Sequence, residues 1–325
     1  MRMKCLIVVV LLCVALVPTA RAQAPAAPAG PVVGLSMIVT DKDNKAVNTI
    51  RKEQIRVFEE GVEQTLLSIE ADERPVDYVI ALDSSGSLNR LFGSALEAAK
   101  LIIVNQRPED QIAFVRFVGH DNIEKVQEFS TDRDVLLKAL DGSHLERGQS
   151  AVIDALYVST QYVDEHNKAN ENRRKVLVVI TDGEDRNSYY KQPDLIKLLH
   201  ETGVQVFVLG LVSELDDQGG FSRVSSRQRA EKLLMAVAAE SGGRVLFPTS
   251  KQELVAGAGE IILDLRAQFR IKYQSNRDAS KKGFRKVEVK FVAAEGDEKR
   301  KLVTPAGYFV GPRTPAAKTE KKKKS

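Results

Sequence analysis

The chain has 325 residues, enough for one large domain with a smaller companion or for two domains. Its 43% hydrophobic and 28% charged residues are ordinary for a globular protein. The net charge of +4 comes from the ends: residues 1–22 carry three cations and no acid, and segment 318–324 carries five Lys and one Glu, which leaves −3 for the rest. This balance, together with the absence of Trp, argues against nucleic-acid binding.

Residues 1–22 have the pattern of a secretory signal peptide. Arg2 and Lys4 precede an apolar run over 5–17 that is short for a membrane span, and Ala20–Ala22 is a small-x-small cleavage site. We therefore expect an exported protein, periplasmic or secreted, with no stable membrane span after cleavage. The alternative is an uncleaved membrane anchor.

Both cysteines, Cys5 and Cys13, lie in this segment. The mature chain is therefore expected to have no disulfide, no thiol nucleophile and no Cys-based zinc site. Residues 23–31 are rich in Ala and Pro and are typical of a flexible spacer. The Lys-rich residues 312–325 are predicted to be a disordered tail.

Two segments, 32–74 and 266–311, have the alternating apolar and polar pattern of β-strands. Neither is long enough to enclose a core easily, so we expect them to pair into one small all-β module. The expected strands are 35–40, 55–59, 65–69, 269–273 and 287–291, with weaker signals at 302–303 and 308–310.

Between them, residues 75–265 alternate apolar strands with amphipathic helices. This alternation predicts an α/β domain with a mostly parallel sheet that is covered on both faces. The expected strands are 78–82, 111–118, 175–181, 205–211 and 244–247, and the expected helices are 91–105, 132–140, 151–166, 192–201, 228–240 and 251–267.

Side chains with oxygen atoms gather where these strands end. Asp83 follows the first strand, with Ser85 and Ser87 at alternate positions, and Asp182 follows the strand 175–181; Ser150 opens a helix. Ligand sites of open α/β sheets lie at the carboxyl ends of the strands. Carboxylate and hydroxyl oxygens suit a small hard cation, so the five residues predict a site for Mg²⁺, with Mn²⁺ or Ca²⁺ possible.

The sequences DSSGS at 83–87 and TDG at 181–183, with the hydroxyl of Ser150 between them, resemble the metal-ion-dependent adhesion site of von Willebrand factor A domains. Ser150 stands where the family pattern has Thr. Segments 39–42, 55–61 and 305–309 are similar to the flanks of exported bacterial proteins that embed such a domain.

This resemblance implies a Rossmann-like, doubly wound fold and a non-enzymatic, adhesive protein–protein interaction. It implies that Ser85 and Ser87 bind the ion directly, and that Ser150 and Asp182 bind it directly or through water. A Glu or Asp of a protein partner then completes the coordination of the ion. Around the site, Asp154 is a candidate for orienting the Ser150 loop, and Glu184 and Asp185 are candidate acceptors around the ion.

Three alternatives stay open at this point. Asp83 could simply cap the helix that follows it. The chain could be a metal-dependent phosphoester hydrolase, although no histidine lies near these loops in the sequence and a hydrolase needs a positioned base. It could also be a structural envelope component whose ion only stabilises the fold.

Overall fold

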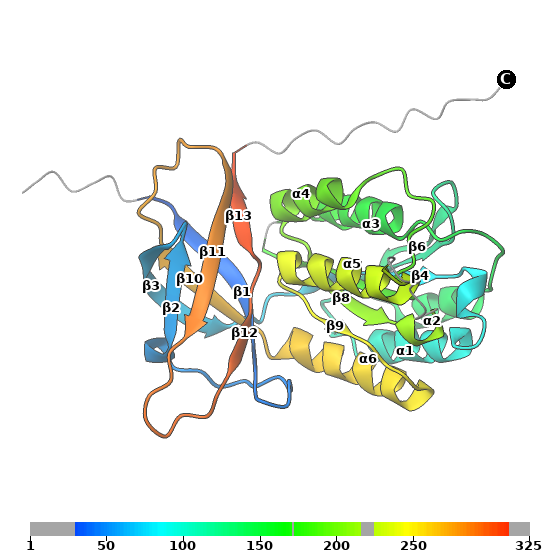
Figure 1. Ribbon diagram of the computed structural model, residues 1–325, viewed down its shortest axis with the longest axis horizontal. Helices are drawn as coiled ribbons and strands as arrows, with labels where there is room; N and C mark the ends of the chain where they lie inside the picture. Colours follow the sequence, from blue (N-terminus) through cyan, green and yellow to red (C-terminus); the bar gives the residue numbers. More distant parts are fainter. Residues whose placement is uncertain (1–29, 171, 216–223, 312–325) are drawn as a thin grey trace, which may run out of the picture.

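The computed structural model describes residues 30–170, 172–215 and 224–311. They form two parts that lie side by side in Figure 1, an α/β part and an all-β module. The predicted signal segment, nearly all of the spacer and the Lys-rich tail lie outside the described residues. Within the described ranges, no helix combines the length and apolar character needed to cross a membrane.

The α/β part is built on six strands: β4 (Val76–Asp83), β5 (Gln111–Phe117), β6 (Ile123–Ser130), β7 (Arg174–Thr181), β8 (Gln205–Gly210) and β9 (Val245–Leu246). They lie in the order β6-β5-β4-β7-β8-β9, and each pair is parallel except β5 with β6. All eight residues of β4 are buried, because helices cover both faces of the sheet.

Six helices form the two covering layers: α1 (Phe92–Val104), α2 (Arg133–Asp141), α3 (Val152–Asn167), α4 (Gln192–Thr202), α5 (Ser226–Ser241) and α6 (Lys251–Arg266). Helices α1, α2 and α6 pack on one face of the sheet, and α3, α4 and α5 pack on the other. The predicted α/β fold with a mostly parallel sheet is confirmed. Short 3-10 helices, η2 (Gly86–Leu88) and η3 (Val212–Glu214), lie in two of the loops.

Strand β6 was not among the predicted strands. It is the edge strand of the sheet, and its residues are half-buried or exposed, with Glu124, Lys125 and Glu128 among them. Charged side chains are common on edge strands, where they discourage pairing with other chains. They also hide the apolar alternation that a sequence-based prediction depends on.

The all-β module consists of seven strands and the short helix η1: β1 (Val32–Thr40), η1 (Lys52–Gln54), β2 (Ile55–Glu59), β3 (Val62–Ala71), β10 (Phe269–Gln274), β11 (Gly283–Phe291), β12 (Lys301–Val303) and β13 (Gly307–Val310). Strand β1 pairs with β10, and β2 pairs with β11, so the two flanking segments form one antiparallel sheet as predicted. The consecutive strands β12 and β13 pair with β1 and β11, at opposite ends of the strand order.

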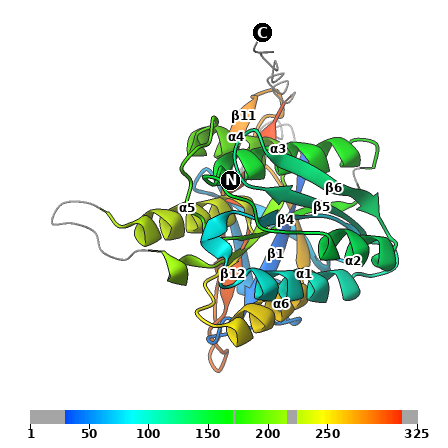
Figure 2. The same cartoon turned by 90° about the vertical axis from the view of Figure 1, so that its right-hand side faces the viewer.

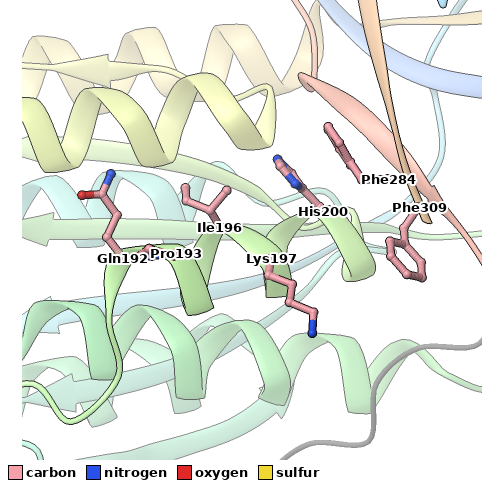
Figure 3. Close-up of a pocket in the computed structure, with 7 residues that line it drawn as sticks. All are labelled: Gln192, Pro193, Ile196, Lys197, His200, Phe284 and Phe309. Atoms are coloured by element: carbon pink, nitrogen blue, oxygen red, sulfur yellow. The ribbon is translucent and has the colours of Figure 1, made fainter. Parts of the chain in front are cut away.

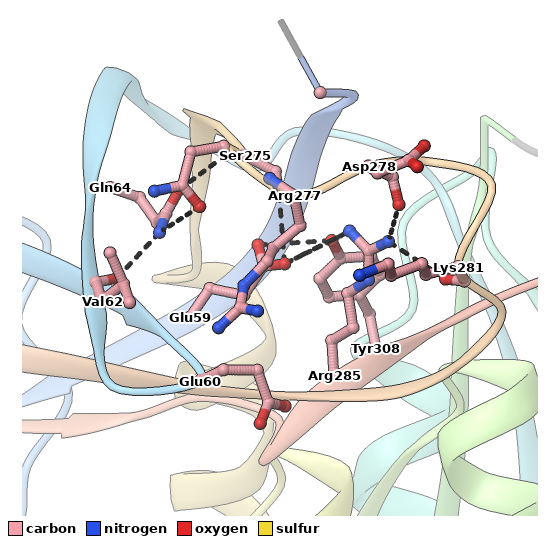
Figure 4. Close-up of polar contacts among 12 residues, drawn as sticks. Glu59, Glu60, Val62, Gln64, Ser275, Arg277, Asp278, Lys281, Arg285 and Tyr308 are labelled. Atoms are coloured by element: carbon pink, nitrogen blue, oxygen red, sulfur yellow. Dashed lines mark hydrogen bonds and ion pairs between the residues drawn. The ribbon is translucent and has the colours of Figure 1, made fainter. Parts of the chain in front are cut away.

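The module encloses a buried carboxylate, Glu59, at the end of β2 (Figure 4). The hydroxyl of Tyr273 donates to its Oε2 at 3.0 Å, and the hydroxyl of Ser275 donates to its Oε1 at 3.1 Å. The guanidinium of Arg285 lies 3.3 Å from Oε1, and the Tyr308 hydroxyl lies 3.3 Å from both oxygens. Glu59 therefore has its counter-charge and its hydrogen bonds within the chain.

The two parts meet where the carboxyl ends of α4 and α5 approach the module. The backbone N–H of Ala306 donates to the carbonyl of Glu240 at 3.3 Å, and the ring of His200 stacks on Phe284 at 3.8 Å between centroids. A shallow hollow of about 420 Å³ opens beside this stack, between α4 and the strands β11 and β13 (Figure 3). Gly242 ends α5 at φ 73°, with Pro305 packed against it.

Candidate metal centre

The carboxyl ends of β4 and β7 form one rim, at the end of the α/β part away from the module (Figure 1). The two strands are parallel neighbours, with Leu82 opposite Ile180. Asp83 and Asp182 therefore lie at the same edge of the sheet. Figure 2 faces this rim, with the cyan segment that follows β4 near its centre.

The loop after β4 folds around Asp83. Its Oδ1 accepts a hydrogen bond from the backbone N–H of Ser85 at 2.9 Å, and the hydroxyls of Ser85 and Ser87 lie 2.8 Å apart. Helix α1 begins after Leu91, and no side chain caps it. Asp83 does not cap that helix, so the alternative role considered for it is excluded, and three of the predicted ligands lie together.

Asp182 begins the loop after β7 and is completely buried. Its Oδ1 accepts from the backbone N–H of Glu184 at 2.9 Å, whereas its Oδ2 is buried with no hydrogen-bond partner among the described residues. A buried carboxylate oxygen without a partner is costly in a folded protein. This atom is the clearest sign that something absent from the chain belongs at the rim.

Thr181 contributes a contact that the sequence did not reveal. Its hydroxyl donates to Asp83 Oδ2 at 2.7 Å and accepts from the backbone N–H of Gly183 at 3.0 Å. Thr181 thus ties the carboxylate at the end of β4 to the loop after β7. The sequence shows Thr181 as part of the TDG motif. Its contact with Asp83 exists because β4 and β7 are neighbouring strands, which the sequence does not show.

Ser150 reaches the rim from the loop before α3. It is 5% exposed, and its carbonyl accepts hydrogen bonds from the backbone N–H groups of Arg186 and Asn187 at 2.9 and 3.2 Å. In the part of the chain that the structure describes, no hydrogen bond joins the Ser150 hydroxyl to the other four predicted ligands. The backbone holds this residue at the rim, beside the loop that carries Asp182.

Two acids brace the start of α3 against the loop after β7. Asp154 accepts from the backbone N–H groups of Tyr189 and Tyr190, each at 2.8 Å. Asp185 accepts from the backbone N–H of Ile153 at 3.1 Å. Asp154 thus contacts the loop after β7, and its expected orientation of the Ser150 loop stays a prediction. Asp185 joins the same loop to the start of α3.

Glu184 has a different partner. Its carboxylate forms an ion pair with Arg186 at 2.6 Å on the same loop. Its backbone N–H, rather than its side chain, contacts Asp182. Glu184 therefore helps to hold the loop conformation, and its own charge is balanced.

The electrostatics of the rim favour a cation. Burial raises the pKa of Asp83 to about 7, and repulsion by the neighbouring Asp182 adds to the rise. Burial likewise raises the pKa of Asp182, and the nearby Ser87 hydroxyl and the backbone N–H of Glu184 oppose that effect. Across 30–170, 172–215 and 224–311, no Lys, Arg or His forms an ion pair with either carboxylate. A divalent cation would supply the missing counter-charge.

The residues present fit a hard divalent cation. Their donor atoms are all oxygens, from two carboxylates and three hydroxyls, and one carboxylate oxygen is unpartnered. The described residues contain no group of three or more His, Cys, Asp or Glu placed to hold a metal. The rim does not form such a group, because only two of its five predicted ligands are acids and the other three are serine hydroxyls.

One histidine comes near the rim, which the sequence did not suggest. The exposed His120 lies with its Nδ1 3.0 Å from the side-chain nitrogen of Asn187, on the loop after Asp182. The strands β5 and β7 flank β4, so residues far apart in the sequence meet here.

The family model of the von Willebrand factor type A domain matches residues 77–253. No curated protein matches the chain.

Similar solved structures include the conserved hypothetical protein BatB from Bacteroides thetaiotaomicron, at 20% identity, with 58% of this chain and 98% of that chain covered and a TM-score of 0.46. A von Willebrand factor type A protein from Catenulispora acidiphila is 13% identical, with 79% and 75% covered and a TM-score of 0.47. Proximal thread matrix protein 1 of the mussel byssus, with a zinc-occupied MIDAS motif, is 19% identical, with 62% and 48% covered and a TM-score of 0.46.

Proposed function

Because the chain belongs to the von Willebrand factor type A domain family, we propose that its rim binds a divalent cation and, through that ion, a carboxylate of a partner protein. The observation that carries this proposal is the unpartnered, buried Oδ2 of Asp182 beside the buried carboxylate of Asp83. Both acids have raised pKa values, chiefly because they are buried away from water, and the charge of Asp182 adds to the rise at Asp83.

We assign the ion to Asp83, Ser85, Ser87, Ser150 and Asp182. The two aspartates would supply the negative charge, and the serines would supply neutral oxygens. Mg²⁺ is our first choice, because hydroxyls and water suit its small octahedral shell, and Mn²⁺ or Ca²⁺ are alternatives. When bound, the ion would offer a coordination position to an outside carboxylate oxygen.

The number of charges supports a partner carboxylate. Two aspartates balance a divalent ion and leave no excess negative charge to repel an incoming acid. Ser87 is exposed at the mouth of the site, whereas Asp83 and Asp182 are buried beneath it. A partner can therefore approach from the open side of the rim without displacing the aspartates.

We propose further that this interaction serves adhesion outside the cytoplasm and that the protein is not an enzyme. The pattern of residues 1–22 supports export to the periplasm or the medium. The rim side chains support the binding of a partner rather than catalysis. They are carboxylates and hydroxyls assigned as ligands of the ion, so none of them is left over as a general base.

A pull-down from cell-envelope extract, in Mg²⁺ or in chelator, tests the proposal. The native chain should retain a partner in Mg²⁺ and release it in chelator, and Asp83→Ala should retain none in either buffer. The matched control is Asp121→Ala, which removes an exposed acid of the nearby loop and should behave like the native chain. Full partner retention in chelator, with circular dichroism unchanged, would contradict the proposal.

A further inference from the structure

A partly open hollow of about 270 Å³ lies beside the loop that follows Asp182. It lies between the loop after β7 and the first turns of α5, and the start of α3 lines its third side. Its lining residues are Ile153, Gly183, Glu184, Asp185, Arg186, Gln192, Ser226, Arg229, Ala230 and Leu233. Gly183 and Glu184 follow Asp182 in the chain, so the hollow borders the loop that carries Asp182.

The wall between the rim and the hollow is closely packed. Gly183 has a φ of 74°, and a Cβ at this position would lie 2.7 Å from Leu234 Cδ1. The loop is therefore seated on α5, and only glycine fits there without strain. The hollow keeps a fixed place relative to Asp182.

The charges that line the hollow leave one cation without an acidic partner. Glu184 pairs with Arg186, and Asp185 accepts from the backbone of α3. The exposed guanidinium of Arg229 donates to the carbonyl of Val224 at 2.6 Å and to the Ser226 hydroxyl at 3.1 Å, which are both neutral. No ion pair of Arg229 with a carboxylate occurs within the described ranges.

The floor of the hollow is apolar. Ile153 and Leu233 are each 8% exposed and Ala230 is 2% exposed, so their surfaces are nearly covered already. An occupant that suits both the floor and Arg229 has an aliphatic stem and an anionic end, which is the chemistry of a glutamate side chain.

We propose that this hollow is a second subsite, which takes a Glu side chain of the same partner segment whose first carboxylate binds at the metal centre. This inference rests on the proposed function. Arg229 pairs with the second carboxylate, and the apolar floor contacts its stem. The chain would therefore prefer partners that present two acids close together over partners that present one.

Binding of labelled peptides tests the subsite. The probes are blocked Gly/Ser peptides that carry either one Glu or two Glu at varied spacing, measured by fluorescence anisotropy in Mg²⁺ and in chelator. With the native full chain in Mg²⁺, the best two-Glu peptide should bind roughly three- to tenfold more tightly than the one-Glu peptide.

Arg229→Gln should abolish this preference and leave Mg²⁺-dependent binding of the one-Glu peptide unchanged, which also reports that the variant is folded. Arg229→Lys should keep part of the preference. The matched control is Lys232→Gln, an exposed cation on the same helix outside the hollow, which should keep all of it.

Equal affinity of the native chain for both peptide types would overturn the subsite, as would a preference that survives Arg229→Gln or is lost equally in Lys232→Gln. In each of these cases the one-Glu peptide still reports on the proposed function. Binding of the one-Glu peptide that does not depend on Mg²⁺ would overturn the proposed function and the subsite together.

Discussion

Two of the buried acidic centres in the described residues differ in how their charge is balanced. In the module, Glu59 is surrounded by Arg285, two tyrosine hydroxyls and a serine hydroxyl from its own chain. At the rim, Asp83 and Asp182 face each other, and one oxygen of Asp182 has no partner in the described residues. Burial of a carboxylate is costly in both places, but only the module balances that cost from within.

The two centres show how a buried acid that stabilises the fold differs from a buried acid that is available to bind a ligand. A buried acid with a complete set of partners contributes to the fold and has nothing left to bind. A buried pair of acids with raised pKa values is a candidate binding site, because an outside cation would stabilise it.

The largest effect is expected from Glu59→Ala. This change leaves the guanidinium of Arg285, whose side chain is 8% exposed, without its carboxylate, and breaking a buried ion pair costs about 3–5 kcal/mol. Urea unfolding should report this loss. The control Glu288→Ala, on the exposed face of β11, should stay within about 0.5 kcal/mol of the native chain. Equal stability of the two variants would show that the Glu59 centre is not structural.

Mg²⁺ should stabilise the native chain by about 3 kcal/mol when its free concentration is about a hundred times the dissociation constant. Asp83→Asn should lose this gain, because it removes a ligand. In chelator the same variant should be no less stable than the native chain, because repulsion of Asp182 is relieved. Thermal unfolding with and without Mg²⁺ measures both effects. A full Mg²⁺ response in Asp83→Asn would remove Asp83 from the site.

A smaller change is expected from Asp154→Asn. Asp154 holds the backbone of the loop that carries Asp182, and loss of such an outer support typically weakens metal affinity by about tenfold. Isothermal titration with Mg²⁺ measures the change. Glu165→Gln, at the exposed end of the same helix, is the control. If both variants bind Mg²⁺ like the native chain, the brace does not position the ligands.

The smallest effect concerns Asp297 in the module, which accepts from the backbone of Ala294 and from the side chains of Gln54 and Arg51. These hydrogen bonds lower its pKa to about 2. The folded-state pKa lies below the unfolded value, so the stability it contributes is present above about pH 4 and is lost as the pH falls toward 2.

Asp297→Asn should therefore lower the urea midpoint slightly at pH 6, and the difference from the native chain should shrink at pH 3. A difference that is constant across this range would show that the charge of Asp297 is not responsible. Unlike the response to Mg²⁺, this effect should be the same in chelator, because Asp297 has its hydrogen-bond partners within the module and is not among the residues assigned to the ion.

The sequence predicted most of the fold because the two parts follow different periodicities. Apolar strands and amphipathic helices alternate between residues 75 and 265, and the flanks alternate residue by residue. The edge strand β6 was missed because its two exposed acids and one exposed lysine mask that alternation. The pairing of β12 and β13 at the two edges of the module was not predictable, because these strands are very short and their pairing is a tertiary effect.

The part of the site that is formed by residues close together in the sequence could be predicted. Asp83, Ser85 and Ser87 lie within one loop, and their spacing alone places them together. The contact of Thr181 with Asp83 and the brace by Asp154 join residues from different loops, so they depend on which strands are neighbours. Arg229 carried no signal in the sequence, because its importance comes from a hollow that three separate segments enclose.

The pairing of β3 with β10 has a consequence for biosynthesis. Residues 62–71 leave the ribosome long before residues 269–274, and the whole α/β part is translated in between. Because domains tend to fold as units while the chain is made, the α/β part is expected to fold first, while the early strands wait for their partners. Premature termination after α6 would then release an intact rim attached to β1, β2 and β3 without their partners β10 and β11, and the exposed edges of these strands are prone to aggregate.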